Sequence, residues 1–352
     1  MTTTGRRPPV GGRLPTLDDV ARAAGVSRAT ASRAINGIRN VDPQLHAVVW
    51  DAVERTGYVP NRLARSLVTR RTGIIALVVS DSESHDDDPF LNRFFADPYF
   101  GRVVGGLMRV LHPAGIQLAL QFVGTGEQRA RLVGDLRHGQ ADGVIVVSLP
   151  GHDPLPGMLT DAGVPAVMIG RPGEPVPISY VDLAHDTGAA LAADHLVRRG
   201  CQLIGMISGP VDVPASSDRI AGFRRSLARH GHAWLPQAAG NFTQESGYTA
   251  MQALLTETPG LDGVFVANDL MALGALVALR EAGRHVPADV AVVGFDDSSA
   301  ATAANPALTT VRHPLEDMAA EAARLLLTHI DDPGLRVSSV IYEPALVLRR
   351  ST

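Results

Sequence analysis

The sequence predicts two folded units, a small all-α head near the N-terminus and a larger α/β body built from doubly wound parallel sheets. The chain has 352 residues, which exceeds one ordinary domain. Residues 15–60 show helical periodicity and almost no strand pattern, whereas apolar β-branched runs alternate with helical segments from residue 72 onward. Near-continuous apolar strands that alternate with helices are typical of buried parallel sheets covered on both faces.

Charge is distributed unevenly between the two units. The formal net charge is −4, but residues 1–71 contain 12 arginines against 5 acidic residues, and residues 72–352 contain 20 arginines against 31 acidic residues. A basic head on an acidic body indicates that the head meets a polyanion and the body does not. The alternative is an ordinary solvated basic face, and charge alone does not decide between the two.

The composition also bears on the compartment. No run of about 18 or more apolar residues is present, so we expect no membrane-spanning helix. Residues 1–14 lack the apolar core of a signal peptide, and we expect them to form a disordered basic tail. The one cysteine, Cys201, cannot form an internal disulfide, which fits a reducing compartment. We therefore expect a cytoplasmic protein.

Capping residues predict three helices in the head. Thr16 can cap the first helix, with Asp19 in its first turn. Gly25 can adopt the positive φ that ends this helix, and Ser27 can cap the second. A third helix over 42–56 begins with an Asp-Pro pair. The apolar faces expected to form a small core contain Leu17, Val20, Ala21, Ala24, Val26, Ala31, Ala34, Ile35, Val48, Val49, Ala52 and Val53.

The second helix carries polar residues on its outer face. Two short helices joined by a glycine turn have the geometry that lets the second helix enter the major groove of DNA. Arginine reads guanine edges with two hydrogen bonds, and Ser or Thr reaches base edges or phosphates. An ordinary helical subdomain is the alternative. The candidate DNA contacts of the head are Thr16, Ser27, Arg28, Ala29, Thr30, Ser32, Arg33, Asn36 and Tyr58.

Residues 16–37, followed by 58–67, closely resemble the DNA-binding headpiece of the lactose-repressor (LacI/GalR) family of transcriptional regulators. The resemblance extends over essentially the whole chain, because the body resembles the family's effector domain, which is itself similar to periplasmic sugar-binding proteins. It implies a homodimeric repressor that binds a palindromic operator in double-stranded DNA at the nucleoid, under the control of a small molecule. Ala31 stands where the family usually has valine, which weakens the core of the head slightly.

The resemblance also implies a hinge helix between head and body. Residues 61–67 match the family's hinge, which folds on operator DNA and pairs with its dimer mate in the minor groove, and the family's leucine wedge falls on Leu67. An apolar wedge can open a base step and bend the duplex. A buried linker residue is the alternative for Leu67. The candidate hinge contacts are Asn61, Arg62, Ala64, Arg65 and Leu67, of which the two arginines can reach phosphates.

In the body, strands are expected over 74–80, 117–122, 143–148, 166–169, 203–207, 263–267 and 290–294. Helices are expected over 101–111, 127–137, 185–199, 219–229, 245–255, 270–282 and 315–327. This number of units favours two lobes, with a ligand cleft at the carboxyl ends of their strands. Gly124-Thr125-Gly126 lacks the third glycine of a dinucleotide fingerprint, so no cofactor is expected.

Polar and aromatic residues of the body indicate a site for a polyol, most simply a sugar. Carboxylates and amides suit hydroxyl groups, although each aspartate has an alternative role as a helix cap. The resemblance implies that Arg219 is the family's ligand-clamping arginine, and Arg171 would add a second donor. The candidate effector-binding residues are Tyr99, Phe100, Ser148, Arg171, Asp182, Arg219, Phe242, Asn268 and Asp296, with the aromatic ones as flat apolar walls.

Residues 81–98 form an acidic segment that is longer than the family's loop after the first strand. His85 among its aspartates resembles a metal cluster, but a flexible acidic loop explains the composition better, and we expect no metal. His195, Cys201 and the other histidines show no ligand spacing and are interpreted as structural. No nucleophile–base pair is apparent, so no enzyme is expected. The absence of a leucine-heptad tail favours a dimer over a tetramer.

The expected domains are a tail over 1–14, a helix-turn-helix domain over 15–60, a hinge over 61–71 and an effector-binding and dimerisation domain over 72–352. Within the last, the N-lobe covers about 72–182 and 314–338, and the C-lobe covers about 183–313 and 339–352. A sugar-binding receptor without DNA function is the alternative to a regulator, and the head and the missing signal peptide argue against it.

Overall fold

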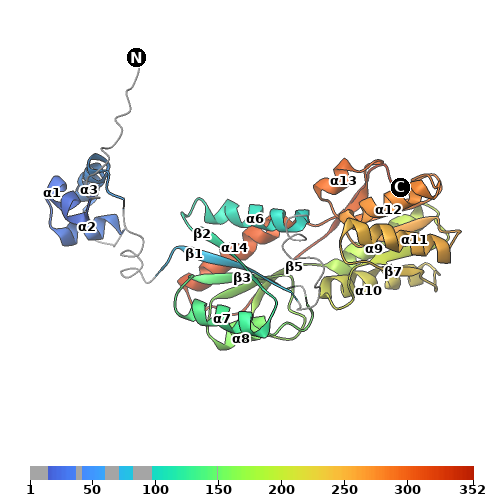
Figure 1. Cartoon of the computed structure of the whole chain (residues 1–352), viewed down its shortest axis with the longest axis horizontal. Coiled ribbons are helices and arrows are strands. Elements are labelled where there is room, and N and C mark those ends of the chain that lie inside the picture. The colour runs from blue at the N-terminus through green and yellow to red at the C-terminus, as the bar shows by residue number, and fades with distance from the viewer. Residues whose placement is uncertain (1–14, 37–41, 60–70, 82–96, 149) are drawn as a thin grey trace, which may run out of the picture. The chain divides into compact units, whose positions relative to one another are not determined.

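The computed structural model describes residues 15–36, 42–59, 71–81, 97–148 and 150–352 (Figure 1). Contacts divide the chain into two units, 1–73 and 74–352, and we describe each by itself. The basic tail and most of the acidic segment fall outside the described residues. Among the described residues, no helix is long and apolar enough to cross a membrane. Also outside are the candidate hinge residues Asn61, Arg62, Ala64, Arg65 and Leu67.

The head consists of α1 (Leu17–Ala24), α2 (Arg28–Ile35) and α3 (Pro43–Thr56). Gly25 ends α1 with a φ of 66°, which glycine adopts without steric cost. Ser27 caps α2 by accepting a hydrogen bond from the Thr30 amide. The local capping chemistry of the sequence therefore positions both helices of the helix-turn-helix.

The core of the head is a single small cluster. Its buried members are Val20, Ala21, Ala31, Ala34, Ile35, Val49, Ala52 and Val53. The prediction that Val48 joins this core is wrong, because its side chain is 44% exposed. Two eight-residue helices cover only a narrow stripe of α3, and Val49 and Val53 fill that stripe.

The N-lobe has a parallel six-stranded sheet in the order β11-β5-β4-β3-β1-β2. Its strands are β1 (Ile74–Ser80), β2 (Gln117–Val123), β3 (Gly143–Ser148), β4 (Ala166–Ile169), β5 (Ser179–Leu183) and β11 (Ser339–Tyr342). Its helices are α6 (Pro98–Leu111), α7 (Gly126–Arg137), α8 (Leu155–Asp161) and α14 (Leu315–Asp331). α6 and α14 cover one face of the sheet, and α7 and α8 cover the other (Figure 1).

The C-lobe repeats this plan in the order β12-β10-β9-β8-β6-β7, with β12 antiparallel to β10. Its strands are β6 (Ile204–Ser208), β7 (Gln237–Ala239), β8 (Gly263–Val266), β9 (Ala291–Asp296), β10 (Thr309–Arg312) and β12 (Ala345–Val347). Its helices are α9 (His185–Arg198), α10 (Pro214–Arg229), α11 (Gln244–Glu257), α12 (Asp269–Glu281) and α13 (Ser299–Ala303). α9 and α10 pack so closely that Gly222 leaves no room for a Cβ against the Asp186 backbone. The predicted fold class, two doubly wound lobes, is confirmed.

The chain crosses between the lobes three times, after β5, after β10 and after β11. Residues 339–342, assigned to the C-lobe from the sequence, belong instead to the N-lobe, because β11 pairs with β5. The sequence boundary fails there because β11 is a short, half-exposed edge strand without a continuous apolar run. One apolar cluster continues through both lobes at the crossings, and it includes Leu183, Phe295, Val311 and Leu315.

Candidate functional site

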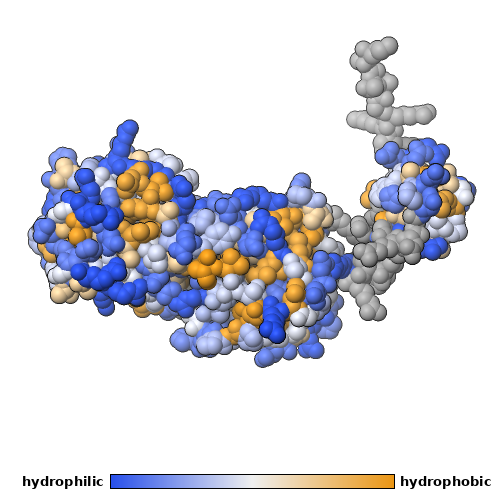
Figure 2. Space-filling view, turned by 180° about the vertical axis from the view of Figure 1, so that it is seen from behind, coloured by the Kyte–Doolittle hydropathy of each residue, from blue (hydrophilic) through white to orange (hydrophobic). Residues whose placement is uncertain are grey.

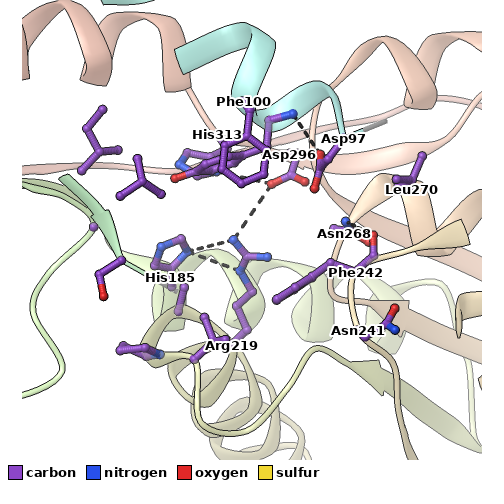
Figure 3. Close-up of a pocket in the computed structure, with 18 of the residues that line it drawn as sticks. Asp97, Phe100, His185, Arg219, Asn241, Phe242, Asn268, Leu270, Asp296 and His313 are labelled. Atoms are coloured by element: carbon purple, nitrogen blue, oxygen red, sulfur yellow. Dashed lines mark hydrogen bonds and ion pairs between the residues drawn. The ribbon is translucent and has the colours of Figure 1, made fainter. Parts of the chain in front are cut away.

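A cavity of about 690 Å³ lies between the two lobes of the body (Figure 3). All nine candidate effector residues line it, namely Tyr99, Phe100, Ser148, Arg171, Asp182, Arg219, Phe242, Asn268 and Asp296. They come from segments far apart in the chain that meet at the carboxyl ends of the strands, as parallel sheets require. Within the described part of the chain, no group of His, Cys, Asp or Glu side chains has the arrangement of a metal site.

Asp182, His185 and Arg219 form a chain of polar contacts at the cavity. Nε2 of His185 lies 3.4 Å from Oδ1 of Asp182, and Nδ1 accepts from Nε and Nη2 of Arg219 at 3.3 Å. Burial, together with the Arg219 charge, lowers the pKa of His185 to about 4. Although burial opposes ionisation, the hydrogen bond from His185 lowers the pKa of Asp182 below its ordinary value. At neutral pH the pair is therefore a neutral imidazole that donates to a carboxylate.

Arg219 is a buried cation, and some of its N–H groups form no hydrogen bond within the described residues. Its Nη1 donates to the carbonyl of Ala267, and its Cζ lies 3.7 Å from the ring centroid of Phe295. Nη2 lies 4.0 Å from Oδ1 of Asp296. Burial lowers the pKa of Arg219, but an arginine remains charged at neutral pH. Its bonds to His185 and Ala267 occupy three of the five guanidinium N–H groups, and the other two form no hydrogen bond with the described residues.

Asp296 and Asp297, at the end of β9, adopt φ values of 113° and 51°. Residues other than glycine rarely adopt such positive φ values, and backbone strain of this kind is concentrated at ligand sites. The Asp296 carboxylate lies at the cavity, 3.3 Å from Nδ1 of His313 (Figure 3). The Asp297 carboxylate instead binds Arg312 and Arg349 of the C-lobe. The strained pair therefore directs one carboxylate to the cavity and anchors the other.

The N-lobe contributes an aromatic wall at the start of α6. Asp97 caps this helix by accepting a hydrogen bond from the Tyr99 amide at 2.9 Å. The rings of Tyr99 and Phe100 meet edge to face with their centroids 5.2 Å apart. Burial and the charge of Asp296 raise the pKa of Asp97 to about 6, against the lowering effect of its hydrogen bond. Burial, helped by the nearby carboxylates, raises the pKa of Tyr99, so its hydroxyl stays protonated.

Asn268 and Phe242 shape the opposite wall. The Asn268 side chain caps α12 by accepting from the Met271 amide, and it donates to the Phe242 carbonyl at 3.0 Å. Phe242 has a φ of 69°, and its ring covers Gly209, where a Cβ would have no room. Asn268 therefore acts first as a cap that fixes the position of Phe242, whereas the sequence suggested a partner for ligand hydroxyls.

Arg171 is paired with an acidic residue of the other lobe. Its Nε and Nη2 bind Asp218 of α10, with Nε–Oδ2 at 3.0 Å and Nη2–Oδ1 at 2.7 Å, while Nη1 forms no hydrogen bond with the described residues. Arg171 follows β4 of the N-lobe, so this ion pair joins the two lobes beside the cavity. Ser148 is similarly occupied, because its hydroxyl donates to Asp153 at 2.7 Å.

Four titratable residues that line the cavity are not among the residues predicted from the sequence, namely Asp97, His185, Glu245 and His313. The histidines were interpreted as structural because they have no metal-ligand spacing. A positional signal was available, since His185 lies three residues after Asp182 and His313 directly follows β10. Residues at the carboxyl end of a strand in such a sheet face the ligand cleft whatever their spacing.

The candidate DNA face of the head is exposed along α2. The exposed candidates are Ser27, Arg28, Ala29 and Arg33. Nε of Arg28 lies 3.6 Å from Oδ1 of Asp18 of α1. Four of the other candidates are half-buried, namely Thr16, Thr30, Ser32 and Asn36. The last, Tyr58, packs against the core of the head. The structure therefore presents the polar face of α2 outward, as the sequence predicts.

A helix-turn-helix head followed by a two-lobed body with a polar cleft defines a ligand-responsive DNA-binding regulator. Comparison with family models agrees with this class. Residues 16–61 match the bacterial regulatory proteins of the lacI family, and residues 193–352 match the periplasmic binding protein-like domain.

The chain is 43% identical to the HTH-type transcriptional regulator CelR of Thermobifida fusca, over 96% of this chain and 98% of that protein. It is 33% identical to the HTH-type transcriptional repressor PurR of Edwardsiella ictaluri, over 96% of this chain and 97% of that protein. The chain therefore belongs to the LacI family, and it is a DNA-binding transcriptional regulator rather than an enzyme. The resemblance predicted from the sequence is confirmed.

Solved structures of two relatives match the fold over nearly the whole chain. A CelR–cellobiose complex has a TM-score of 0.74 and 41% identity, and it covers 96% of this chain and 100% of its own. A lac repressor dimer bound to operator and the anti-inducer ONPF has a TM-score of 0.80 and 26% identity, with coverages of 97% and 99%.

Proposed function

We propose that the protein is a homodimeric repressor whose affinity for a palindromic operator is controlled by a cello-oligosaccharide, in the first place cellobiose, bound in the cleft. The observation that carries the proposal is the lining of the cavity, where aromatic rings face carboxylates and one buried arginine. Flat rings suit the apolar faces of sugars, and carboxylates suit their hydroxyl groups. The cellobiose complex of a relative that is similar over nearly the whole chain supports the choice of sugar.

The charges of the lining favour an uncharged ligand. Its acidic side chains are Asp97, Asp182, Glu245 and Asp296. Arg219 opposes them, while Arg171 is already paired with Asp218 and both lining histidines have lowered pKa values. A phosphorylated sugar or a nucleotide would bring negative charge toward these carboxylates, at a Coulombic cost. The cavity volume of about 690 Å³ is within the range of small-molecule sites.

We assign the contacts by donor and acceptor type. Asp182 and Asp296 accept from sugar hydroxyls, and the two remaining N–H groups of Arg219 donate to sugar oxygens. Tyr99, with Phe100 behind it, and Phe242 pack against the ring faces. In this proposal the other predicted residues, Ser148, Arg171 and Asn268, hold the walls of the cleft.

On the DNA side, two heads bind the half-sites of the palindrome through the polar face of α2. We infer that residues 61–71 form the hinge between head and body, and that Leu67 of each protomer enters the minor groove at the centre of the operator. Apolar patches interrupt the hydrophilic surface of the body in the view of Figure 2, and the edge strand β2 exposes Leu120. These surfaces offer area for a second protomer, and the dimer works in the cytoplasm at the nucleoid.

The control step is a change in the population of two lobe arrangements. A sugar that contacts both lobes binds one arrangement better and shifts the equilibrium toward it, and the hinge spacing follows the lobes. The Arg171–Asp218 pair, which joins the lobes beside the cavity, is one of the contacts that this shift would change.

Calorimetric titration tests the sugar assignment. Cellobiose should bind the purified protein, whereas maltose and glucose 6-phosphate should bind at least about tenfold more weakly. A palindromic duplex selected from a random pool should then lose or gain affinity by about 5- to 150-fold when cellobiose is added, the usual range of allosteric coupling. Tight binding of the phosphorylated sugar, or no effect of cellobiose on duplex affinity, would reject the proposal.

A further inference from the structure

Arg102 lies where the two lobes meet, and four of its five N–H groups have partners. It projects from α6 of the N-lobe, and its side chain is only 17% exposed. Nε and Nη2 bind the two oxygens of Glu316 at 2.7 and 2.8 Å. Nη1 donates to the Asp296 carbonyl at 2.9 Å, and Nη2 donates to the His313 carbonyl at 2.7 Å. One guanidinium therefore joins α6 and α14 of the N-lobe to the end of β9 and the crossing after β10.

The Asp296 carbonyl that Arg102 binds belongs to the strained residue whose carboxylate lies at the cavity. The φ of 113° at Asp296 is unfavourable for an aspartate, so surrounding contacts must hold it. On one side the Asp297 carboxylate is fixed by Arg312 and Arg349 of the C-lobe. On the other side the Asp296 carbonyl is held by Arg102 of the N-lobe. Because the carbonyl carbon and Cβ are bonded to the same Cα, holding the carbonyl restricts the direction of the Cα–Cβ bond from which the carboxylate reaches the cavity.

The platform that carries Arg102 is rigid. Gly106 of α6 lies so close to α14 that a Cβ would collide with the Glu316 backbone and with Ala319. A second arginine of the same helix, Arg109, pairs with Asp317 of α14 at 2.6 Å. The donors of Arg102 therefore have a fixed position within the N-lobe. The conformation of Asp296 consequently depends on the position of the N-lobe relative to the C-lobe.

We propose that Arg102 is a positioning residue for effector binding, which holds the Asp296 main chain from the N-lobe in the conformation that aims its carboxylate at the ligand. The inference rests on the proposed function, because it takes the cleft as the effector site. By this proposal, the Asp296 carboxylate of the C-lobe recognises the ligand only when the N-lobe holds Arg102 against the Asp296 carbonyl. A sugar bound by Asp296 then favours the lobe arrangement in which Arg102 reaches the carbonyl.

The test compares two arginines of one helix. Arg102→Gln removes the bonds to both carbonyls, whereas the matched control Arg109→Gln removes only an exposed ion pair between the same two helices. Titration with cellobiose should show at least about a tenfold loss of affinity for Arg102→Gln, since charge-assisted hydrogen bonds are lost. The control should stay within about twofold of the parent. Equal affinities of Arg102→Gln and the parent would overturn the proposal.

A double-mutant cycle separates positioning from general destabilisation. If Arg102 acts through Asp296, then Arg102→Gln should weaken cellobiose binding in the parent but add little in an Asp296→Asn background. Full additivity of the two losses would overturn the proposal. Should Arg102→Gln fail to fold, Arg102→Lys serves instead. Lysine keeps the charge but cannot reach two carbonyls and a carboxylate in one plane, so an intermediate loss is expected and an unchanged affinity again contradicts the role.

The two proposals fail in different ways. If the parent protein does not bind cellobiose, the sugar assignment is wrong and the inference falls with it. If the parent binds cellobiose and Arg102→Gln binds it equally well, the sugar assignment stands and only the role of Arg102 is wrong.

Discussion

Arg219→Ala should remove the response to the effector and leave operator binding in place. The guanidinium keeps two N–H groups for a ligand after its bonds to His185 and Ala267 are counted. Hydrogen bonds to charged groups contribute about 1.5–3 kcal/mol each, so the loss of two amounts to about 3–6 kcal/mol. Since about 1.4 kcal/mol corresponds to a tenfold change, cellobiose affinity should fall by at least about 100-fold.

The same substitution also affects the unliganded protein. The Ala267 carbonyl and Nδ1 of His185 lose their donor, and the Asp296 carboxylate loses a cation 4.0 Å away. Leaving buried polar groups unsatisfied costs about 1–3 kcal/mol, and water that enters the vacated space moderates the cost. We therefore expect a lower melting temperature but a folded dimer.

Titration calorimetry with cellobiose and anisotropy with a labelled operator measure the two effects separately. Arg225→Ala is the matched control, because Arg225 lies on the same helix and forms an exposed pair with Asp186. The control should bind cellobiose as the parent does. Cellobiose affinity of Arg219→Ala within about threefold of the parent would refute the assignment of this arginine to the ligand.

Three further predictions concern the hinge, the cleft and the packing of the body. Leu67→Ala should weaken binding to the selected operator by at least about tenfold in anisotropy assays while salt-sensitive binding to random duplex persists, and equal losses on both duplexes would contradict a wedge. The folded-state pKa of Asp97, about 6, lies above its ordinary 3.8, so the stability that this group contributes is lost as the pH rises through about 6. Asp97→Asn should therefore raise the melting temperature at neutral pH but not near pH 4. An equal rise at both pH values would show that ionisation of Asp97 does not destabilise the folded protein. Gly222→Ala should destabilise the protein by about 1–3 kcal/mol in urea unfolding, because its Cβ would meet the Asp186 carbonyl. Gly101→Ala, whose Cβ would meet no atom within 4 Å, is the control and should not destabilise.

Local chemistry made the head and most of the sheets predictable. The cap at Ser27 and the turn at Gly25 depend on neighbouring residues alone, so the sequence contains all the information they need. The same holds for β1 and β3, which read as continuous apolar runs because both faces of the sheet are covered. The short edge strands β7 and β11 carry no such pattern and were not predicted. The interior strands β5 and β10 were not predicted either, because runs of five and four residues are too short to stand out.

The site was predictable as a set of residues but not as a network. Strand ends converge in this fold, and this brought all nine candidates to one cavity. The partners of those residues depend on distances between remote segments, which no local pattern encodes. Nothing near Arg171 in the sequence therefore indicated that Asp218, 47 positions away, would bind its Nε and Nη2. For the same reason nothing in the sequence indicated that Arg102 would meet Asp296, 194 positions away.

The threefold crossing of the chain has a consequence for the order of synthesis. The N-lobe lacks α14 and β11 until residue 342 has been made, and the C-lobe lacks β12 until residue 347. The head, by contrast, is a contiguous segment with its own core near the start of the chain. On the ribosome the head therefore has its whole fold long before either lobe does. A chain that stops short of α14 would therefore carry a complete head on a body that lacks its ligand cleft.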